Sequence, residues 1–585
     1  MPHTQATPSN IASPHRIRSA KPHPLARALA HALPGALLLS AGLLVASPAQ
    51  ANNYQVLNTQ DSGAGSLREA IDLANANPGP DTITFASSVS GSINLTSGPL
   101  YIYDSVDVQG PGADTLTVNG STISTPPPAQ GNGNNGQSPS QASVFLISPE
   151  GQADVASRLS GEHTTGSPPT AIDVTIGGLT ITGGNSKYGG GIAAVVTHLT
   201  VKNCVISNNT ATMAGGGVFG FTKYGSLNIE DSVISNNTVT GSGASGGSPF
   251  QPGGGGIASF LQDTTIMRST VSGNAAPNGG GILAQSDYGV TATAQGTTGA
   301  PTPLTTSLAI SNSTITGNQT NATPPDLRAH FGNNATTGGS PYGLYGVGGG
   351  ALSLASNVTI DNSTISGNNS GFAGGGLALL TYNTSTASID SSTISGNYSA
   401  YYGGGLALAL GASSNPAISD TVIGGNSAAG GEPDSSVGSL GSGSPATAVD
   451  LNYSLVQVPA TSGVNDLVGN IFNQAPMLGA LANNGGPTMT QLPLSGSPLI
   501  DAGDPGYSGA AFDQRGSGFS RIVNGRVDIG ATEFGAGSPG GAGGYTNVAV
   551  PGLGWLGKLG LGGLLGLAVM GSARRRRKQG PMIRS

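Results

Sequence analysis

The sequence predicts an all-β fold, a parallel β-helix whose short strands stack coil upon coil. We expect a short capping helix before it, a cap after it, and signal and transmembrane helices at the termini. Two observations carry this prediction: β-branched runs recur in register between Val201 and Ile423, and glycine triplets recur with them. A single unit of short strands cannot bury its apolar side, whereas stacked copies can. A helical repeat would space its apolar residues by three and four and avoid this much glycine.

The register of the repeat can be followed column by column. Two β-branched columns, which fit a buried pleated wall, comprise Val201, Ile229, Ile266, Ile310, Ile360, Ile389 and Ile418, and Ile206, Ile234, Val271, Ile315, Ile365, Ile394 and Ile423. Three residues later stand Asn209, Asn237, Asn274, Asn318, Asn368, Asn397 and Asn426. We expect these asparagines to take a left-handed corner and to bond from coil to coil. The glycine triplets begin at Gly189, Gly215, Gly254, Gly279, Gly348, Gly374 and Gly403.

These columns resemble the right-handed parallel β-helix of the pectate-lyase-like superfamily, including its asparagine ladder. The resemblance covers roughly Thr82 to Asn473, so we expect the β-helix over residues 82–473. It implies a fold rather than an activity, because this scaffold hosts lyases, hydrolases, adhesins and inert spikes.

Composition points to an extracellular repeat protein. Of 585 residues, 97 are glycine and only 8% are charged, against about 25% in a typical domain. The formal net charge of −7 is spread over a large surface and gives no basis for a nucleic-acid partner. The single cysteine, Cys204, takes a position that other units fill with serine. This position predicts that Cys204 is a small packed side chain and that it forms neither a disulfide nor a metal site.

The N-terminus is typical of a secretory signal peptide, residues 1–51. Basic residues precede the apolar run from Gly35 to Ala46, and Ala49-Gln50-Ala51 closes it. The following 30 or so residues (52–81) predict an N-terminal cap. There Leu67, Ala70, Ile71 and Ala74 form one apolar stripe, and Ser66 and Glu69 have capping-box spacing.

The segment from Gly65 resembles the CSLREA-type segment of bacterial surface β-helices, with Gly65 in place of the cysteine. A helix here would close the open end of the solenoid against strand-on-strand association. The alternative, a catalytic role for Arg68 and Glu69, is disfavoured because both lie off the apolar stripe, where solvated charges are the default.

Several stretches interrupt the repeat. A Pro/Gly/Asn/Gln-rich excursion runs from Ser124 to Ser143, and insertions are expected at about Thr240–Pro252, Asp287–Thr306 and Gln319–Gly346. In solenoids such insertions leave from one face as loops, where partners usually bind.

A charged region follows the repeat, at residues 474–534. It resembles the choice-of-anchor Q region of bacterial surface proteins, through NNGGPTMTQLPLSGSPLIDAGDP, DQRG and DIGATE. Its charges are Asp501, Asp504, Asp513, Arg515, Arg521, Arg526, Asp528 and Glu533. Two interpretations stay open: a salt-bridged C-terminal cap, or a calcium or glycan site built on carboxylates and loop carbonyls.

The C-terminus predicts a linker and a sorting signal. Residues 535–549 are Gly-rich and lack apolar periodicity, which predicts a flexible linker. Residues 550–585 combine Pro551, Trp555, an apolar run and the basic cluster Arg574–Lys578, an order similar to IPTL-type sorting signals. We expect this segment to engage the membrane with its basic end in the cytoplasm and to be read by a sorting protease. The alternative is a buried amphipathic helix.

No catalytic constellation can be recognised on the coils. Glycosidases of this fold need paired carboxylates, and lyases need a base with Ca²⁺ or Arg. Glu230 and Asp231 recur in columns with other turn-forming residues, whereas His198, Lys202 and Arg268 are isolated charges. We therefore assign no catalytic, cofactor-binding or metal residue and expect no cofactor.

The predicted function is a non-catalytic secreted or cell-surface β-helix with an adhesive, matrix or stalk-like role, with a polysaccharide or another cell-surface ligand as its expected partner. The alternative is a polysaccharide lyase or glycoside hydrolase on the same scaffold.

Overall fold

The computed structural model describes residues 51–123, 142–149, 170–222, 224–241, 252–286, 306–321, 346–354, 357–381, 386–410, 414, 416–439 and 448–537. The predicted signal peptide (apart from Ala51), the sorting segment, and most of the excursion and insertions lie outside these residues. Within them, no helix is long and apolar enough to cross a membrane.

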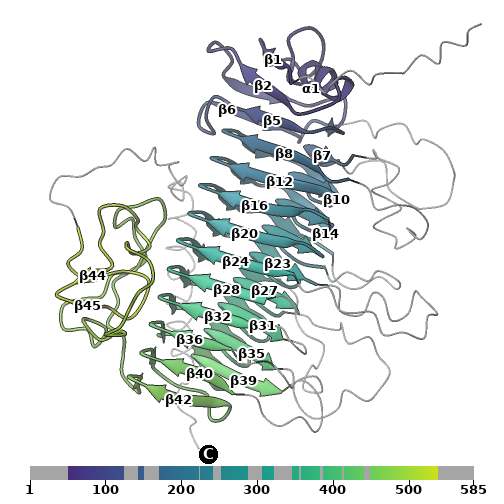
Figure 1. Cartoon of the computed structure of the whole chain (residues 1–585). Helices are drawn as coiled ribbons and strands as arrows, with labels where there is room; N and C mark the ends of the chain where they lie inside the picture. Colours follow the sequence, from purple (N-terminus) through teal and green to yellow (C-terminus); the bar gives the residue numbers. More distant parts are fainter. Residues whose placement is uncertain are drawn as a thin grey trace, which may run out of the picture. The chain divides into compact units, whose positions relative to one another are not determined.

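The described chain forms a solenoid of four parallel sheets, which we name by their strand numbers (Figure 1). The 13-strand sheet contains β1 (Asn53–Val56), β2 (Asp81–Phe85), β5 (Val106–Gln109), β8 (Ile172–Gly177), β12 (Thr197–Lys202), β16 (Ser226–Glu230), β20 (Asp263–Met267), β24 (Ser307–Ser311), β28 (Asn357–Asp361), β32 (Ala387–Asp390), β36 (Ala417–Ser419), β40 (Val449–Asn452) and β42 (Val464–Val468). The 12-strand sheet contains β3 (Gly91–Asn94), β6 (Leu116–Asn119), β9 (Thr180–Thr182), β13 (Val205–Ser207), β17 (Val233–Ser235), β21 (Thr270–Ser272), β25 (Thr314–Thr316), β29 (Thr364–Ser366), β33 (Thr393–Ser395), β37 (Val422–Gly424), β41 (Leu455–Val456) and β43 (Ile471–Phe472).

Two further sheets contain the remaining strands of the coils. The 8-strand sheet contains β10 (Asn185–Tyr188), β14 (Thr210–Ala214), β18 (Thr238–Val239), β22 (Ala275–Ala276), β26 (Gln319–Thr320), β30 (Asn369–Ser370), β34 (Tyr398–Ser399) and β38 (Ser427–Ala428). The 10-strand sheet contains β4 (Leu100–Ile102), β7 (Phe145–Ile147), β11 (Ile192–Val195), β15 (Val218–Phe221), β19 (Ile257–Phe260), β23 (Ile282–Gln285), β27 (Ala351–Leu354), β31 (Leu377–Thr381), β35 (Leu406–Leu410) and β39 (Ser435–Ser439).

The sequence predicts three strands per coil, and the structure adds a fourth in the coils that contain β10 to β38. The strands of the 8-strand sheet stand between the asparagine corner and the glycine triplet, and from β18 onward each has two residues. A two-residue strand is too short to show any alternation of apolar and polar side chains, so this sheet is visible only in the structure.

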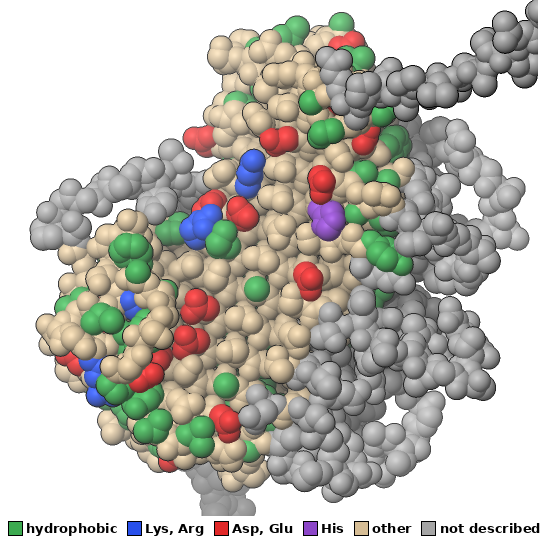
Figure 2. Space-filling model, in the orientation of Figure 1, with side chains coloured by type: hydrophobic (Ala, Val, Ile, Leu, Met, Phe, Trp, Pro, Cys, Tyr) green, Lys and Arg blue, Asp and Glu red, His purple; other side chains and the backbone are tan. Residues whose placement is uncertain are grey.

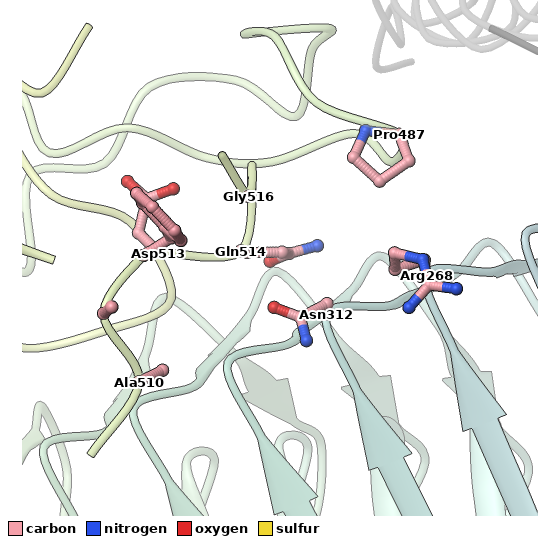
Figure 3. Close-up of a pocket in the computed structure, with 9 residues that line it drawn as sticks. Arg268, Asn312, Pro487, Ala510, Asp513, Gln514 and Gly516 are labelled. Carbon is pink, nitrogen blue, oxygen red and sulfur yellow. The ribbon is translucent and has the colours of Figure 1, made fainter. Parts of the chain in front are cut away.

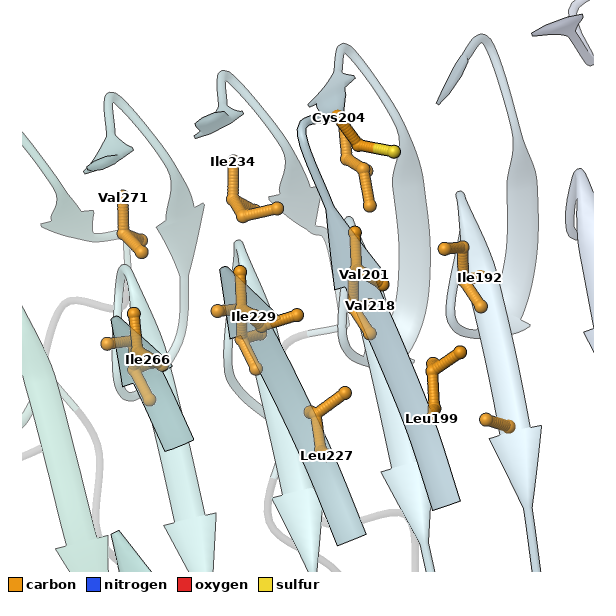
Figure 4. Packing of buried hydrophobic residues seen from close by; sticks show 14 of the residues in the cluster. Ile192, Leu199, Val201, Cys204, Val218, Leu227, Ile229, Ile234, Ile266 and Val271 are labelled. Carbon is orange, nitrogen blue, oxygen red and sulfur yellow. The ribbon is translucent and has the colours of Figure 1, made fainter. Parts of the chain in front are cut away.

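The predicted register is confirmed in both β-branched columns. Each column member pairs with its predicted neighbours; Ile365, for example, pairs with Ile315 and Ile394 and is fully buried. Figure 4 shows Val201, Ile229 and Ile266 stacked in this way in adjacent coils. The core is therefore a set of stacked aliphatic columns inside the coils.

The asparagine ladder is confirmed, but its backbone differs from the prediction. Each asparagine side chain bonds to the next, as Asn368 Nδ2 does to Asn397 Oδ1 at 3.0 Å, and the ladder ends on Asp434. The left-handed residue is the one before the ladder asparagine, such as Asn208 or Gly367. The ladder asparagine can thus turn its amide inward, where Asn368 Nδ2 also bonds to the Ile315 carbonyl.

The first glycine of each triplet is required by its backbone. Gly374 has φ +66°, and a Cβ there would lie 2.4 Å from the Leu377 carbonyl oxygen. Only glycine fits such a corner.

The N-terminal end is covered as predicted by a helix, α1 (Leu67–Ala76), whose four stripe residues are buried. Ser66 Oγ accepts the Glu69 amide at 3.1 Å, while the Glu69 carboxylate accepts the amide of Gly65 instead of that of Ser66. The first coil starts earlier than residue 82, because β1 pairs in parallel with β2.

Arg68 corrects another expectation, because it is not a solvated charge. Its guanidinium bonds to Asp61 at 2.7 Å and to the carbonyls of Gly98 and Pro99. Burial opposes ionisation of Asp61, but the Arg68 hydrogen bond and those from Thr96 and Ser97 outweigh it and lower the pKa of Asp61 well below its usual range. Arg68 therefore ties α1 to the first coil.

Residues 474–534, which we call the flanking segment, do not close the end of the solenoid as predicted. The segment is mostly irregular, with one antiparallel pair, β44 (Ile522–Val523) and β45 (Arg526–Val527). It packs against the outer face of the 12-strand sheet, where Leu499 and Ile529 join Val422 and Leu455 in an apolar cluster. The last strand of the 13-strand sheet, β42, is largely exposed.

Candidate functional site

Of the charges singled out on or beside the 13-strand sheet, the structure joins Arg268 and Asp231 in an ion pair and does not gather the others around them. Figure 2 shows charged side chains scattered over a mostly uncharged surface. Arg268 holds Asp231 through two hydrogen bonds of 2.7 and 2.8 Å. Lys202 lies 3.9 Å from Asp107, and His198 Nδ1 lies 3.2 Å from a serine hydroxyl.

The turn interpretation holds for Asp231 but not for the column of Glu230. Asp231 has φ +46°, as do the equivalent residues of other coils within about 10°. Glu230 instead ends strand β16, and its column partners Asp361 and Asp390 end β28 and β32. These two aspartates pair in register on neighbouring coils.

The flanking segment is attached to the solenoid by a buried amide. Gln514 donates to the Ser313 carbonyl at 3.1 Å and to the Thr314 hydroxyl at 3.0 Å, and it accepts from the Thr364 hydroxyl at 2.6 Å. Farther along, the Ala531 amide donates to the Thr393 hydroxyl at 3.0 Å. A row of outward-facing threonines on the 12-strand sheet thus binds this segment.

A pocket of about 220 Å³ lies at the edge of this contact that is nearer the N-terminal end of the solenoid (Figure 3). Arg268 and Asn312 come from turns of the solenoid, and Gln514 comes from the flanking segment. Asp513, which is paired with Arg515, also lines the pocket, and apolar groups such as Pro487 and Phe512 form most of the rest. Because Arg268 is already paired with Asp231, the pocket presents little net charge.

Toward the C-terminal coils, acidic groups of both regions surround one buried arginine, Arg521. Arg521 is fully buried, and its Nη2 donates to the carbonyls of Asp528 and Gly530. Its Nε and Nη1 have no hydrogen-bond partner among the described residues. The guanidinium carbon lies 5.7 Å from the Tyr507 ring centre.

The solenoid supplies part of this acidic group. Burial, reinforced by the charge of Asp390, raises the pKa of Asp361. Burial likewise raises the pKa of Asp420 to about 6, against the hydrogen bond from the Asp504 amide. Both shifts reflect carboxyls that have lost water without gaining an ion pair.

The flanking segment supplies the other acidic side chains around Arg521. Carboxylate oxygens of Asp501, Asp528 and Glu533 lie within 4.8 Å of one another, where three oxygen ligands could face a cation. Both carboxylates of Asp528 and Glu533 already accept two backbone amides each. Burial raises the pKa of Glu533 to about 7 and also raises that of Asp528. The nearby Arg521 offsets part of the negative charge and the backbone amides already occupy carboxylate oxygens, so we assign no metal here.

The salt-bridged interpretation of this segment is only partly right. Within the described residues of the segment, the one direct ion pair joins Arg515 to Asp513, and both side chains are buried. Arg526 and Arg521 instead donate to backbone carbonyls. Irregular backbone leaves many carbonyls unpaired, and arginine side chains bond to them.

Cys204 fits the prediction of a small packed residue. It is fully buried, its amide donates to Ser232 Oγ at 3.1 Å, and burial raises the pKa of its thiol to about 12. A thiol with so high a pKa is unreactive at neutral pH.

Sequence reasoning missed the grouping of Asp361, Asp390 and Asp420 with Arg521. One signal was present, since Asp361 and Asp390 share a column whose upstream member is Glu230. Nothing in the repeat indicates that a segment about 100 residues later covers that column.

Comparison with known proteins supports the architecture. Residues 304–443 match the family model described as right handed beta helix region. No curated protein matches the chain.

Solved structures that match this chain include pectate lyase Pel9A, with a TM-score of 0.35, 14% identity, and coverage of 82% of this chain and 96% of that one. The A-module of mannuronan C-5 epimerase AlgE6 from Azotobacter vinelandii has a TM-score of 0.36, 14% identity, and coverage of 72% and 99%. Tailspike protein 3 of bacteriophage CBA120 has a TM-score of 0.31, 12% identity, and coverage of 71% and 60%. The repeat region of this chain is a right-handed parallel β-helix.

Proposed function

We propose that this chain is a secreted or cell-surface β-helix protein with a non-catalytic, adhesive, matrix or stalk-like role, and that its partner is a polysaccharide. The observation that carries the proposal is the pairing of Arg268 with Asp231. It engages Asp231 of the adjacent carboxylate pair Glu230-Asp231 that the sequence places on the regular coils, so both Asp231 and Arg268 already have a partner of opposite charge. The largely uncharged outer surface is consistent with binding rather than chemistry.

A glycan-binding assay tests this proposal. The purified protein would be applied to a panel of plant, algal and bacterial polysaccharides, and the same polysaccharides would be checked for cleavage products. We expect binding to at least one of them without product. Turnover that disappears in E230Q, D231N or K202M would overturn the non-catalytic role.

The proposed location rests on the terminal segments, which lie outside the described residues. We propose export through residues 1–51, membrane engagement through residues 550–585, and cleavage near Pro551 by a sorting protease. Mass measurement of surface-associated protein tests this. Recovery of the peptide ending at Ser585 would exclude cleavage, and an unchanged location and mass after replacing the four arginines Arg574–Arg577 would exclude a sorting role.

The alternative, a polysaccharide hydrolase, is favoured by one observation: Asp361 and Asp390 pair on neighbouring coils, and burial raises the pKa of Asp361. Glycoside hydrolysis needs two carboxyl groups close together, one of which can act as the acid. If cleavage is detected and D361N and D390N each abolish it while E230Q does not, this alternative replaces the first.

A further inference from the structure

We propose that attachment of the flanking segment to the solenoid is a pH-sensitive contact controlled by Asp420. The segment is held firmly in mild acid and loosens as the pH rises to neutrality. This goes beyond the proposed function, because it assigns a conformational response to the molecule whatever its ligand is.

The geometry places Asp420 between the two parts. It stands at the turn between β36 and β37 and is 3% exposed. Its Oδ1 accepts the Asp504 amide at 2.7 Å, and its carbonyl accepts the Gly530 amide at 2.8 Å. Two backbone groups of the flanking segment therefore close over this one residue and remove it from water.

The charges around Asp420 do not neutralise it. Asp390 of β32 and Asp504 of the flanking segment face it with negative charge, and Arg521 faces it with positive charge. No salt bridge joins Arg521 to Asp420 in the part of the chain that the structure describes, since its Nη2 bonds to backbone carbonyls. Arg521 is shared with further acidic groups, namely Asp361, Asp528 and Glu533, and Asp501 adds to the charge on Asp528. Arg526 donates to the Ala502 carbonyl and lies over the Tyr453 ring.

The sign of the effect follows from linkage. The pKa of Asp420 is raised from 3.8 to about 6 in the attached state, mainly by burial. Release of the segment returns the carboxyl to water, so the attached state binds the proton more tightly. The contribution of the proton is therefore fully present below pH 3.8 and is lost as the pH rises through 6.

Release would change what the surface offers. The hydroxyls of Thr314, Thr364 and Thr393 would lose their partners in the flanking segment. These hydroxyls and the neighbouring Asp361 would then face solvent. The pH would thus govern access to this strip of the 12-strand sheet.

Thiol labelling can measure the release. Ser395 is buried under the flanking segment, where its hydroxyl bonds to Gln491, so S395C introduces a thiol that reacts only when the segment lifts. The reagent is 4,4′-dithiodipyridine, which works in mild acid, and rates are divided by those of a free thiol at each pH. Cys204, buried inside the coils, reports global unfolding in the same sample.

We expect the relative labelling rate of S395C to rise roughly 30-fold from pH 4.5 to 7.5, the amount that a shift of about two pKa units produces. In S395C/D420N the rise should shrink to a few-fold, because asparagine keeps the acceptor for the Asp504 amide without the charge. The matched control S395C/E230Q alters a carboxylate of the same surface away from the contact and should behave like S395C.

An equal rise with and without D420N, or no rise in S395C, would overturn the proposal. So would a loss of the rise in the E230Q control, because that would indicate a general charge effect. If S395C itself weakens attachment, amide exchange of Gly530 and Ala531 in the protein with and without D420N, corrected for chemical exchange at each pH, gives the same comparison.

Discussion

The coils and the flanking segment are stabilised by two different kinds of contact. In the coils, identical groups stack on themselves, as Ile365 stacks between Ile315 and Ile394 and Asn368 bonds to Asn397. In the flanking segment, different groups meet once, as Gln514 meets Thr364 and Arg521 meets the Gly530 carbonyl. A contact of the coils is repeated between successive coils, whereas a contact of the flanking segment is made by one pair of residues only. The difference predicts where each part of the molecule is sensitive to substitution.

The largest effect is expected in the coils. Ile365→Ala should lower the free energy of unfolding by about 2 to 5 kcal/mol, because the cavity lies inside a packed column and cannot collapse. Thr359→Ala, on the exposed side of the neighbouring strand, is the matched control and should change it by about 0.5 kcal/mol or less. Chemical denaturation measures both, and equal effects of the two substitutions would contradict the inward register.

The next effect should separate the two regions. Gln514→Leu removes the three hydrogen bonds that join this side chain to the solenoid and leaves the buried Thr364 hydroxyl without its acceptor, at a cost of about 1 to 3 kcal/mol. We expect the flanking segment to become sensitive to protease while the unfolding of the coils stays unchanged. If the coils unfold earlier by the same amount, the two regions form one cooperative unit and the contrast fails.

A smaller effect is expected at Asp61, whose contribution to stability should depend on pH in the opposite direction to that of Asp420. The Arg68 ion pair and other hydrogen bonds lower the pKa of Asp61, so its contribution is present above the unfolded value of about 3.8 and is lost as the pH falls. Asp61→Asn should therefore destabilise the N-terminal end by about 1 to 2 kcal/mol at pH 7, and the difference should vanish toward acid pH. Amide exchange in α1 measures it, and a difference that persists in acid would exclude the ion pair as its cause.

The smallest effect is expected at Arg268 and Asp231, whose side chains are about one-third exposed. A double-mutant cycle with R268M and D231N should give a coupling of about 0.2 to 1 kcal/mol, because exposed ion pairs are weakened by solvent. A coupling above about 2 kcal/mol would mean that the pair is a structural link between coils, as the ladders are.

The sequence alone determined the coils. The two β-branched columns, the asparagine ladder, the glycine corners and the α1 stripe all follow from spacing, because each contact in a solenoid is made by the same position one coil away. Short-range chemistry was enough even for the cap of α1 at Ser66 and Glu69.

The tertiary structure decided the features that do not repeat from one coil to the next. The two-residue strands of the 8-strand sheet carry no period, and Arg68 finds its carbonyl partners only once the first coil is formed. The position of the flanking segment depends on contacts such as Gln514 with Ser313, which are 201 residues apart. Asp420 and Arg521 acquire their electrostatic environment only through this packing, since a raised pKa results from burial and burial belongs to the folded chain.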